Sequence, residues 1–147
     1  RGLGDVYKRQ DTDSLIEARY GKKCGEIFSE LGEPEFREVE AEVVREALAT
    51  TGVVSLGGGA VLTESTRDLL DSLTVVYLDI TPEEGVTRTM GGTNRPILES
   101  ADPLARYSQL LEERRPLYTK VADLKVRTGV RSPQQVVGDI LSFLETL

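Results

Sequence analysis

The chain has 147 residues, of which 39% are hydrophobic and 29% charged, and its formal net charge is −7. This length suits one compact domain, and the acidic balance argues against a nucleic-acid partner, because phosphate backbones are bound by surplus lysine and arginine. No apolar stretch approaches the roughly 20 residues of a membrane span, so no membrane partner is expected either. Cys24 is the single cysteine and there is no histidine, which excludes an internal disulfide, a His-based triad and a Cys/His zinc site and favours a cytoplasmic location.

The first ten residues differ from the rest of the chain. They include no initiator methionine, show no periodicity and end in the polar run Lys8-Arg9-Gln10, where an apolar strand would be expected. We therefore expect residues 1–10 to be a non-native leader and residues 11–147 to form one domain.

Three helices are predicted in the first third of the domain. The first begins at Asp13 and ends before Gly21, the second covers residues 26–31, and the third covers residues 34–50. In the third helix the glutamates and arginines are expected to face water. Its apolar side chains are spaced for one buried face, made of Phe36, Val39, Val43, Ala47 and Leu48.

The remaining pattern alternates strands with helices. Residues 53–56 and 74–80 are typical of buried strands, with a helix near residues 65–73 between them. Two capping boxes, Thr81-Pro82-Glu83-Glu84 and Ser132-Pro133-Gln134-Gln135, predict helices at residues 82–90 and 133–144. A loop at residues 91–101, a helix at residues 103–122 and a strand at residues 124–128 complete an α/β fold with a parallel sheet.

Three consecutive glycines, Gly57, Gly58 and Gly59, follow the strand at residues 53–56. Ligands bind beyond the carboxyl ends of parallel strands, and glycines there let a ligand approach bare backbone N–H groups. A tight turn that requires positive φ is the alternative explanation. Asp11 and Asp13 begin a helix and could merely cap it, but on extended backbone one could reach a metal and the other a substrate hydroxyl.

Several arginines are candidates for binding an anion. Arg37 lies next to Phe36, Arg114 precedes a helical proline that should kink the axis, and Arg88 and Arg95 bracket the glycine-containing loop. Each arginine alone could be a surface charge. Their occurrence together with the glycines and aspartates indicates a site for a small polyol acid and a phosphate donor, although the chain contains no G-x-x-x-x-G-K-[ST] loop.

Several motifs in the same order make residues 11–147 resemble shikimate kinase, a P-loop family related to the nucleoside monophosphate kinases. They are D-T-D-x-x-I-E, G-E-x-x-F-R, S-L-G-G-G-A-V, V-V-Y-L-D, R-P-I-L and E-R-R-P-L-Y. The resemblance implies a cytoplasmic monomer with a three-layer α/β/α fold that transfers the γ-phosphate of Mg-ATP to the 3-hydroxyl of shikimate, in the biosynthesis of aromatic amino acids through chorismate.

The resemblance also implies a role for each candidate residue. Asp13 would contact the shikimate hydroxyls and act as the base, and Asp11 would help to hold Mg²⁺. The shikimate carboxylate would lie between Arg37 and Arg114, with the glycines beneath the ring. On the nucleotide side, Arg95 would reach the transferring phosphate from a lid at about residues 90–102. Arg88 and Pro133 would flank the adenine.

One departure from the family pattern concerns the phosphate-binding loop. Family members carry a central strand, a Walker A loop, a helix and a second strand ahead of D-T-D. The roughly 25 to 30 residues that form these elements are missing here. The expected strand order is 2-3-1-4-5 without strand 1, so we expect poor folding and no kinase activity from these 147 residues. Two other functions remain open, namely a related kinase such as a gluconate kinase and a non-catalytic shikimate-binding module.

Overall fold

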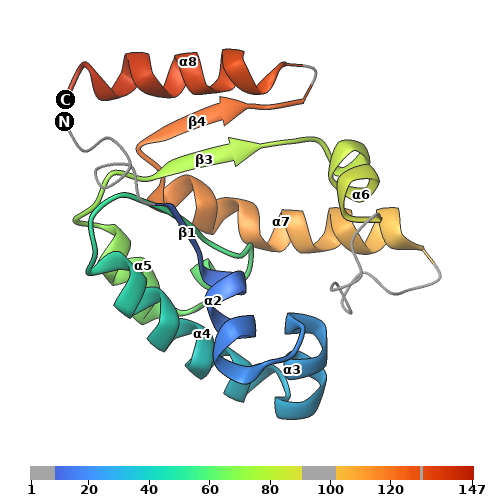
Figure 1. The fold of residues 1–147 in the computed structure, drawn as a ribbon. Helices are drawn as coiled ribbons and strands as arrows, with labels where there is room; N and C mark the ends of the chain where they lie inside the picture. The colour runs from blue at the N-terminus through green and yellow to red at the C-terminus, as the bar shows by residue number, and fades with distance from the viewer. Residues whose placement is uncertain (1–8, 91–101, 130) are drawn as a thin grey trace. The chain divides into compact units, whose positions relative to one another are not determined.

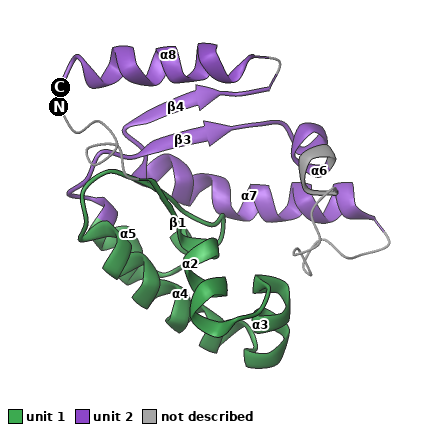
Figure 2. Cartoon of the chain, viewed as in Figure 1, with its two compact units in different colours: residues 1–69, 93–96 green, residues 70–92, 97–147 purple. Residues whose placement is uncertain are grey.

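A computed structural model of the chain describes residues 9–90, 102–129 and 131–147. Helices and parallel strands alternate along it, which confirms the predicted α/β class (Figure 1). The chain divides into two compact units, of which the first comprises residues 1–69 and 93–96 and the second residues 70–92 and 97–147 (Figure 2). No helix in these described ranges has the length and hydrophobicity to cross a bilayer.

The first unit contains two short strands and a group of helices. Its strands β1 and β2 pair in parallel, with Arg9 opposite Val53 and Asp11 opposite Ser55. The elements of this unit are β1 (Arg9–Asp11), α2 (Thr12–Tyr20), α3 (Cys24–Leu31), α4 (Glu33–Leu48), β2 (Val53–Ser55), the 3₁₀ turn η1 (Ala60–Leu62) and α5 (Glu64–Leu70), whose last residue is counted with the second unit.

Strand β2 differs from the prediction of a buried strand. Val53 leaves 60% of its surface exposed and the burial pattern of the strand is exposed, intermediate, exposed. In the described part of the chain β2 has a hydrogen-bonded neighbour on one side only, which is β1. A strand at an edge is covered less completely than one with a partner on both sides.

The core of the first unit lies between helices α2, α3 and α4. Ile16, Ile27, Phe36 and Val43 are each at most 5% exposed and form one cluster with Cys24. The predicted helix ends are confirmed, because Gly21 ends α2 in the left-handed conformation at φ 68° and Gly32 separates α3 from α4 at φ 83°.

The described residues of the second unit form a parallel strand pair with three helices. Strands β3 and β4 pair with Val76 opposite Leu124 and Asp79 opposite Arg127. Strands β2 and β3, which flank the central strand expected from the resemblance, belong to different sheets. The elements of this unit are β3 (Val76–Asp79), α6 (Pro82–Met90), α7 (Pro103–Val121), β4 (Leu124–Arg127) and α8 (Pro133–Leu144).

The capping residues begin the helices of the second unit as the sequence predicted. Ser132 and Gln135 form a reciprocal capping box, in which the Ser132 hydroxyl accepts the Gln135 N–H and the Gln135 side chain accepts the Ser132 N–H. Thr81 accepts the Glu84 N–H at 3.2 Å, but it donates its hydroxyl to the Glu84 carboxylate at 2.8 Å. Asp102 accepts the Ala105 N–H at the start of α7. These bonds satisfy N–H groups that a helix cannot satisfy by itself.

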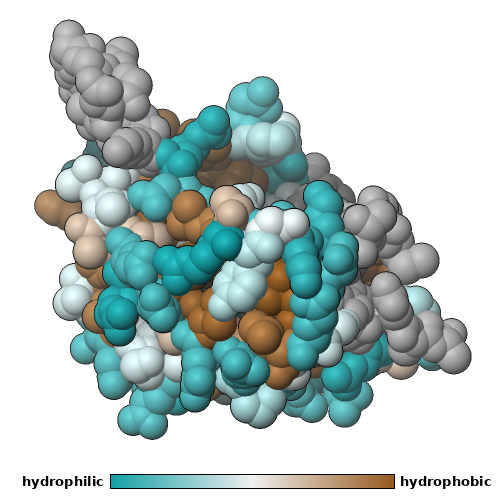
Figure 3. Space-filling view, turned by 60° about the horizontal axis from the view of Figure 1, so that its bottom comes forward, coloured by the Kyte–Doolittle hydropathy of each residue, from teal (hydrophilic) through white to brown (hydrophobic). Residues whose placement is uncertain are grey.

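Hydrophilic side chains make up most of the face shown in Figure 3, and hydrophobic side chains gather in one area near its centre. Some large apolar side chains are more than half exposed, since Leu78 on β3 and Leu141 on α8 are 53% and 54% exposed. Among the described residues, neither side chain is buried in a hydrophobic core.

Ile16 and its neighbour Leu15 provide a test of the core of the first unit. Ile16 is 0% exposed whereas Leu15 is 37% exposed. We predict that Ile16→Ala lowers the free energy of unfolding by about 2 to 5 kcal/mol and Leu15→Ala by about 1 kcal/mol or less, because only the first leaves a cavity. Urea denaturation followed by circular dichroism measures both, and equal losses would contradict the described packing.

Candidate active site

The glycine loop after β2 lies against the start of helix α2. The Gly57 N–H donates to the Thr12 hydroxyl at 3.4 Å, and a Cβ placed on Gly57 would lie 2.7 Å from Oδ1 of Asp13. Gly57 has no positive φ, so the tight-turn explanation does not account for it. The requirement for glycine at this position comes from the close approach of the Asp13 carboxylate.

Arg37 lies against the same loop from helix α4. A Cβ placed on Gly59 would lie 2.6 Å from Cζ of Arg37, and Gly59 has φ −89°, a value open to any residue. The guanidinium therefore occupies the space that a side chain at position 59 would need. Within the first unit, the loop brings together a carboxylate at Gly57 and a guanidinium at Gly59.

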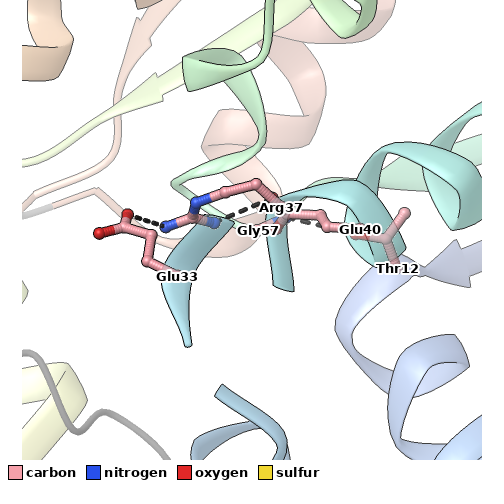
Figure 4. A network of polar contacts seen from close by, with 5 residues as sticks. All are labelled: Thr12, Glu33, Arg37, Glu40 and Gly57. Atoms are coloured by element: carbon pink, nitrogen blue, oxygen red, sulfur yellow. Dashed lines mark hydrogen bonds and ion pairs between the residues drawn. The ribbon is translucent and has the colours of Figure 1, made fainter. Parts of the chain in front are cut away.

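The Arg37 side chain is held by carboxylates and aromatic rings. It donates from Nη1 to Oε1 of Glu40 at 2.9 Å and from Nη2 to Oε2 of Glu33 at 3.3 Å (Figure 4). Its Cζ lies 5.9 Å from the ring centroid of Phe28 and 5.6 Å from that of Phe36. Ion pairing and cation–π attraction thus fix the guanidinium in place before any ligand binds.

The prediction that the charged residues of α4 face water is wrong for two of them. The side chain of Glu40 is 3% exposed and that of Arg37 is 16% exposed. Burial of both charges is tolerated because each neutralises the other at hydrogen-bond distance. The Arg37 Nε is also buried and has no hydrogen-bond partner among the described residues.

Asp11 acts as the N-cap of α2. Its Oδ1 accepts the N–H groups of Asp13 and Ser14 at 2.9 and 3.3 Å, so the capping role considered from the sequence is present. The residue is exposed, and both of these hydrogen bonds use Oδ1. Within the described ranges no three carboxylate, cysteine or histidine side chains cluster as a metal cage would require.

The other predicted site residues lie in the second unit or outside the described residues. Arg114 is half-buried on α7, in a helix that continues through Pro116. Pro133 is exposed at the first position of α8. Arg88 belongs to α6, whose last residues have no described side chains, and Arg95 with most of the expected lid lies outside the described residues.

The sequence analysis missed Glu40, Glu33 and Phe28 as partners of Arg37. Glu33 and Glu40 stand four residues before and three residues after Arg37, which are the spacings that bring side chains together on one helix face. Glu40 also follows the spacing of the buried residues Phe36, Val43 and Val44. The spacing of Glu40 from Arg37 and its spacing from the buried apolar residues could together have predicted a buried ion pair.

Comparisons with known proteins agree on one family. The family model described as "SKI: Shikimate kinase" matches residues 6–145. Among curated proteins, the shikimate kinase of Corynebacterium efficiens is 60% identical over 135 residues, which are 92% of this chain and 80% of that protein. The shikimate kinase of Rhodococcus erythropolis is 50% identical over 136 residues, 92% of this chain and 80% of that protein.

Solved structures give the same result. The shikimate kinase of Acinetobacter baumannii, in complex with shikimate, matches with a TM-score of 0.91 and 31% identity and covers 95% of this chain and 79% of its own. The shikimate kinase of Aquifex aeolicus matches with a TM-score of 0.78 and 35% identity, over 95% of this chain and 82% of its own.

The two glutamates that pair with Arg37 offer a matched test of the buried ion pair. The side chain of Glu40 is 3% exposed and that of Glu33 is 54% exposed. We predict that Glu40→Gln lowers the free energy of unfolding by about 2 to 4 kcal/mol, because it removes the buried counter-ion of Arg37 and leaves only the exposed Glu33. Glu33→Gln should cost under about 1 kcal/mol, as exposed pairs do. Urea denaturation of both variants measures the difference, and a Glu33 loss as large as the Glu40 loss would refute this account.

Proposed function

The chain belongs to the shikimate kinase family, and we propose that it supplies the residues that hold shikimate while the γ-phosphate of ATP is transferred to the 3-hydroxyl. The reaction forms the bond between phosphorus and the substrate oxygen and breaks the bond between the γ-phosphorus and the bridging oxygen of ATP. The products are shikimate 3-phosphate and ADP, and the hydroxyl proton leaves to a base.

The observation that carries this proposal is the fixed guanidinium of Arg37 beside the glycine loop. Its Nε is a buried donor without an acceptor among the described residues, and a carboxylate ligand would supply one. The missing Cβ at Gly59 leaves room for the guanidinium against the backbone. Arg37 is therefore our first candidate to bind the shikimate carboxylate, and the resemblance assigns Arg114 as the second guanidinium.

Asp13 is our candidate for the base and for binding the shikimate hydroxyls. Its carboxylate lies beside Gly57 at the same loop, and a general base must come within hydrogen-bond reach of the proton that it takes. Gly57, Gly58 and Gly59 would offer backbone rather than side chains to the ring. Positioning and charge neutralisation provide most of the catalysis in phosphoryl transfer, so fixed groups of this kind suit the reaction.

The nucleotide side of the proposal rests on the resemblance. Arg88 and Pro133 are assigned to the adenine and Arg95 to the transferring phosphate. Mg²⁺ would neutralise charge on the phosphates when bound, and Asp11 fits a role in holding it through water. One oxygen of this exposed carboxylate is used by the helix cap, and Mg²⁺ typically takes one or two protein carboxylates together with waters and phosphates.

Two alternatives were left open by the sequence. The relatives described above are named shikimate kinases, which favours a carboxylated ring over gluconate as the acceptor. A non-catalytic shikimate-binding module would keep Arg37 and the glycine loop but transfer no phosphate. We further propose a cytoplasmic location, which the single cysteine favours, and a monomer, which the resemblance implies.

Substitution of Arg37 tests the carboxylate site directly. We predict that Arg37→Lys weakens shikimate binding by roughly 1.5 to 3 kcal/mol, because lysine cannot make the forked hydrogen bonds of a guanidinium. Arg19 is the matched control, since it also pairs with two glutamates, Glu42 and Glu46, but on an exposed surface. Isothermal titration calorimetry with shikimate should show normal affinity for Arg19→Lys, and similar losses in the two variants would contradict the assignment.

The phosphate donor requires a separate test. We propose that these 147 residues transfer no phosphate by themselves, because no G-x-x-x-x-G-K-[ST] sequence is present to bind the ATP phosphates. A coupled assay that detects ADP should record no turnover for them. It should record turnover when the central strand, Walker A loop, helix and second strand of a shikimate kinase precede residue 9. Ordinary turnover without those elements would refute this proposal, and shikimate binding without turnover in the extended protein would favour the binding-module alternative.

A further inference from the structure

We propose that Tyr118 is a positioning residue for Arg114, and that Tyr77 and Asp79 hold Tyr118 in place. All four residues belong to the second unit, so the inference depends only on contacts within that unit. It rests on the proposed function, because Arg114 acquires its importance from the role proposed for it with shikimate.

The network begins with a buried carboxylate at the end of strand β3. Asp79 is 6% exposed and accepts the Tyr77 hydroxyl at 3.1 Å, since residues two apart on a strand share one face. Lys125, opposite Tyr77 on β4, lies with Nζ 3.5 Å from Oδ2 of Asp79 and 5.8 Å from the centroid of the Tyr77 ring. The Tyr77 ring is therefore held at its hydroxyl and over one face.

The environment of Tyr77 keeps its hydroxyl protonated. Burial raises the pKa of Tyr77 to about 12, helped by the hydrogen bond to Asp79 and by the Asp79 charge, while the nearby Arg115 guanidinium opposes the shift. The hydroxyl is thus a hydrogen-bond donor throughout the neutral range. Arg115 lies close enough to act on this ring, which brings the arginine-bearing turn of α7 near Tyr77.

Tyr118 connects helix α7 to this fixed ring. The ring centroids of Tyr77 and Tyr118 are 5.0 Å apart with planes inclined at 42°. Aromatic pairs at such separations stabilise an arrangement by a factor of about 2 to 12 in an equilibrium constant. The contact therefore attaches the C-terminal half of α7 to the sheet at one defined point.

Arg114 lies one helical turn before Tyr118. Side chains four residues apart share a helix face, so Tyr118 stands on the face of α7 that carries Arg114 and is placed to limit its movement. This turn needs such support, because Pro116 has no N–H to offer the carbonyl of Glu112 and the helix lacks one backbone bond there. Among the described residues Arg114 has no ion-pair partner that would fix it.

A double-mutant cycle tests the coupling. Shikimate binding to the 147-residue chain would be measured by calorimetry for the unchanged chain, Tyr118→Leu, Arg114→Ala and the double variant. Arg114→Ala should weaken binding roughly 10- to 150-fold, and Tyr118→Leu about 3- to 10-fold. In the Arg114→Ala background Tyr118→Leu should change the affinity less than about 2-fold, because the side chain that it positions is gone.

Conservative variants separate positioning from general stability. Tyr118→Phe keeps the ring contact and should restore affinity to within about 2-fold. If the Tyr118→Leu variant shows no cooperative thermal transition, Tyr77→Phe takes its place, both with Arg114 present and in the Arg114→Ala variant. Tyr77→Phe removes the hydrogen bond to Asp79. It should weaken shikimate binding about 2- to 5-fold only when Arg114 is present.

The outcomes distinguish this inference from the function on which it depends. Weakening of equal size in both backgrounds, or no weakening by Tyr118→Leu, would overturn the positioning role while leaving the role of Arg114 intact. Unchanged affinity in Arg114→Ala would overturn the assignment of Arg114 to shikimate, and with it the inference. Absence of shikimate binding by an unchanged chain that shows a cooperative thermal transition would overturn both.

Discussion

The buried ion pair between Arg37 and Glu40 is the interaction on which the candidate site depends. The Arg37 side chain is only 16% exposed, so its guanidinium has lost much of its contact with water, and the Glu40 carboxylate at 2.9 Å compensates for that loss. The pair also fixes the direction of the arginine, since Glu40 is itself anchored on the buried face of α4 beside Val43 and Val44. Helix α4 therefore contributes both to the core of the first unit and to the candidate site.

The local charge around Arg37 explains why a second cation is needed for an anionic ligand. Glu33 and Glu40 together bring two negative charges to one guanidinium, so the cluster is net negative before a ligand arrives. An incoming carboxylate would increase that imbalance in a chain whose net charge is already −7. A second arginine would relieve that imbalance, and the proposed function assigns this part to Arg114.

Local rules predicted much of the fold from the sequence. Most helices were predicted at the correct positions from three local signals, each of which depends only on residues close in the sequence. The signals were the glycines at the helix ends, the caps at Ser132 and Thr81, and the apolar spacing of α4. The exposure of Val53 was not predicted, since it depends on which strand lies beside β2. The burial of Glu40 was missed because a charged residue is assigned to solvent unless its partner is recognised.

The glycine loop could be located from the sequence, but the reason for its glycines could not. Both close contacts, of Gly57 with Asp13 and of Gly59 with Arg37, join residues more than twenty positions apart. Only the fold reveals that the missing side chains make room for two charged groups. Conformational freedom, the first explanation for any glycine cluster, is not used at Gly57 or Gly59.

Because Glu33 already contacts Arg37 from an exposed position, binding of a carboxylate ligand at the proposed site would be an exchange of one carboxylate for another. Glu33 occupies Nη2 at 3.3 Å while its own side chain remains 54% exposed, so its release costs under about 1 kcal/mol. An arriving acid meets a guanidinium that has already lost much of its hydration and already has the geometry of an ion pair. Much of the ordering and desolvation of the arginine is completed during folding and does not have to be repeated at each binding event.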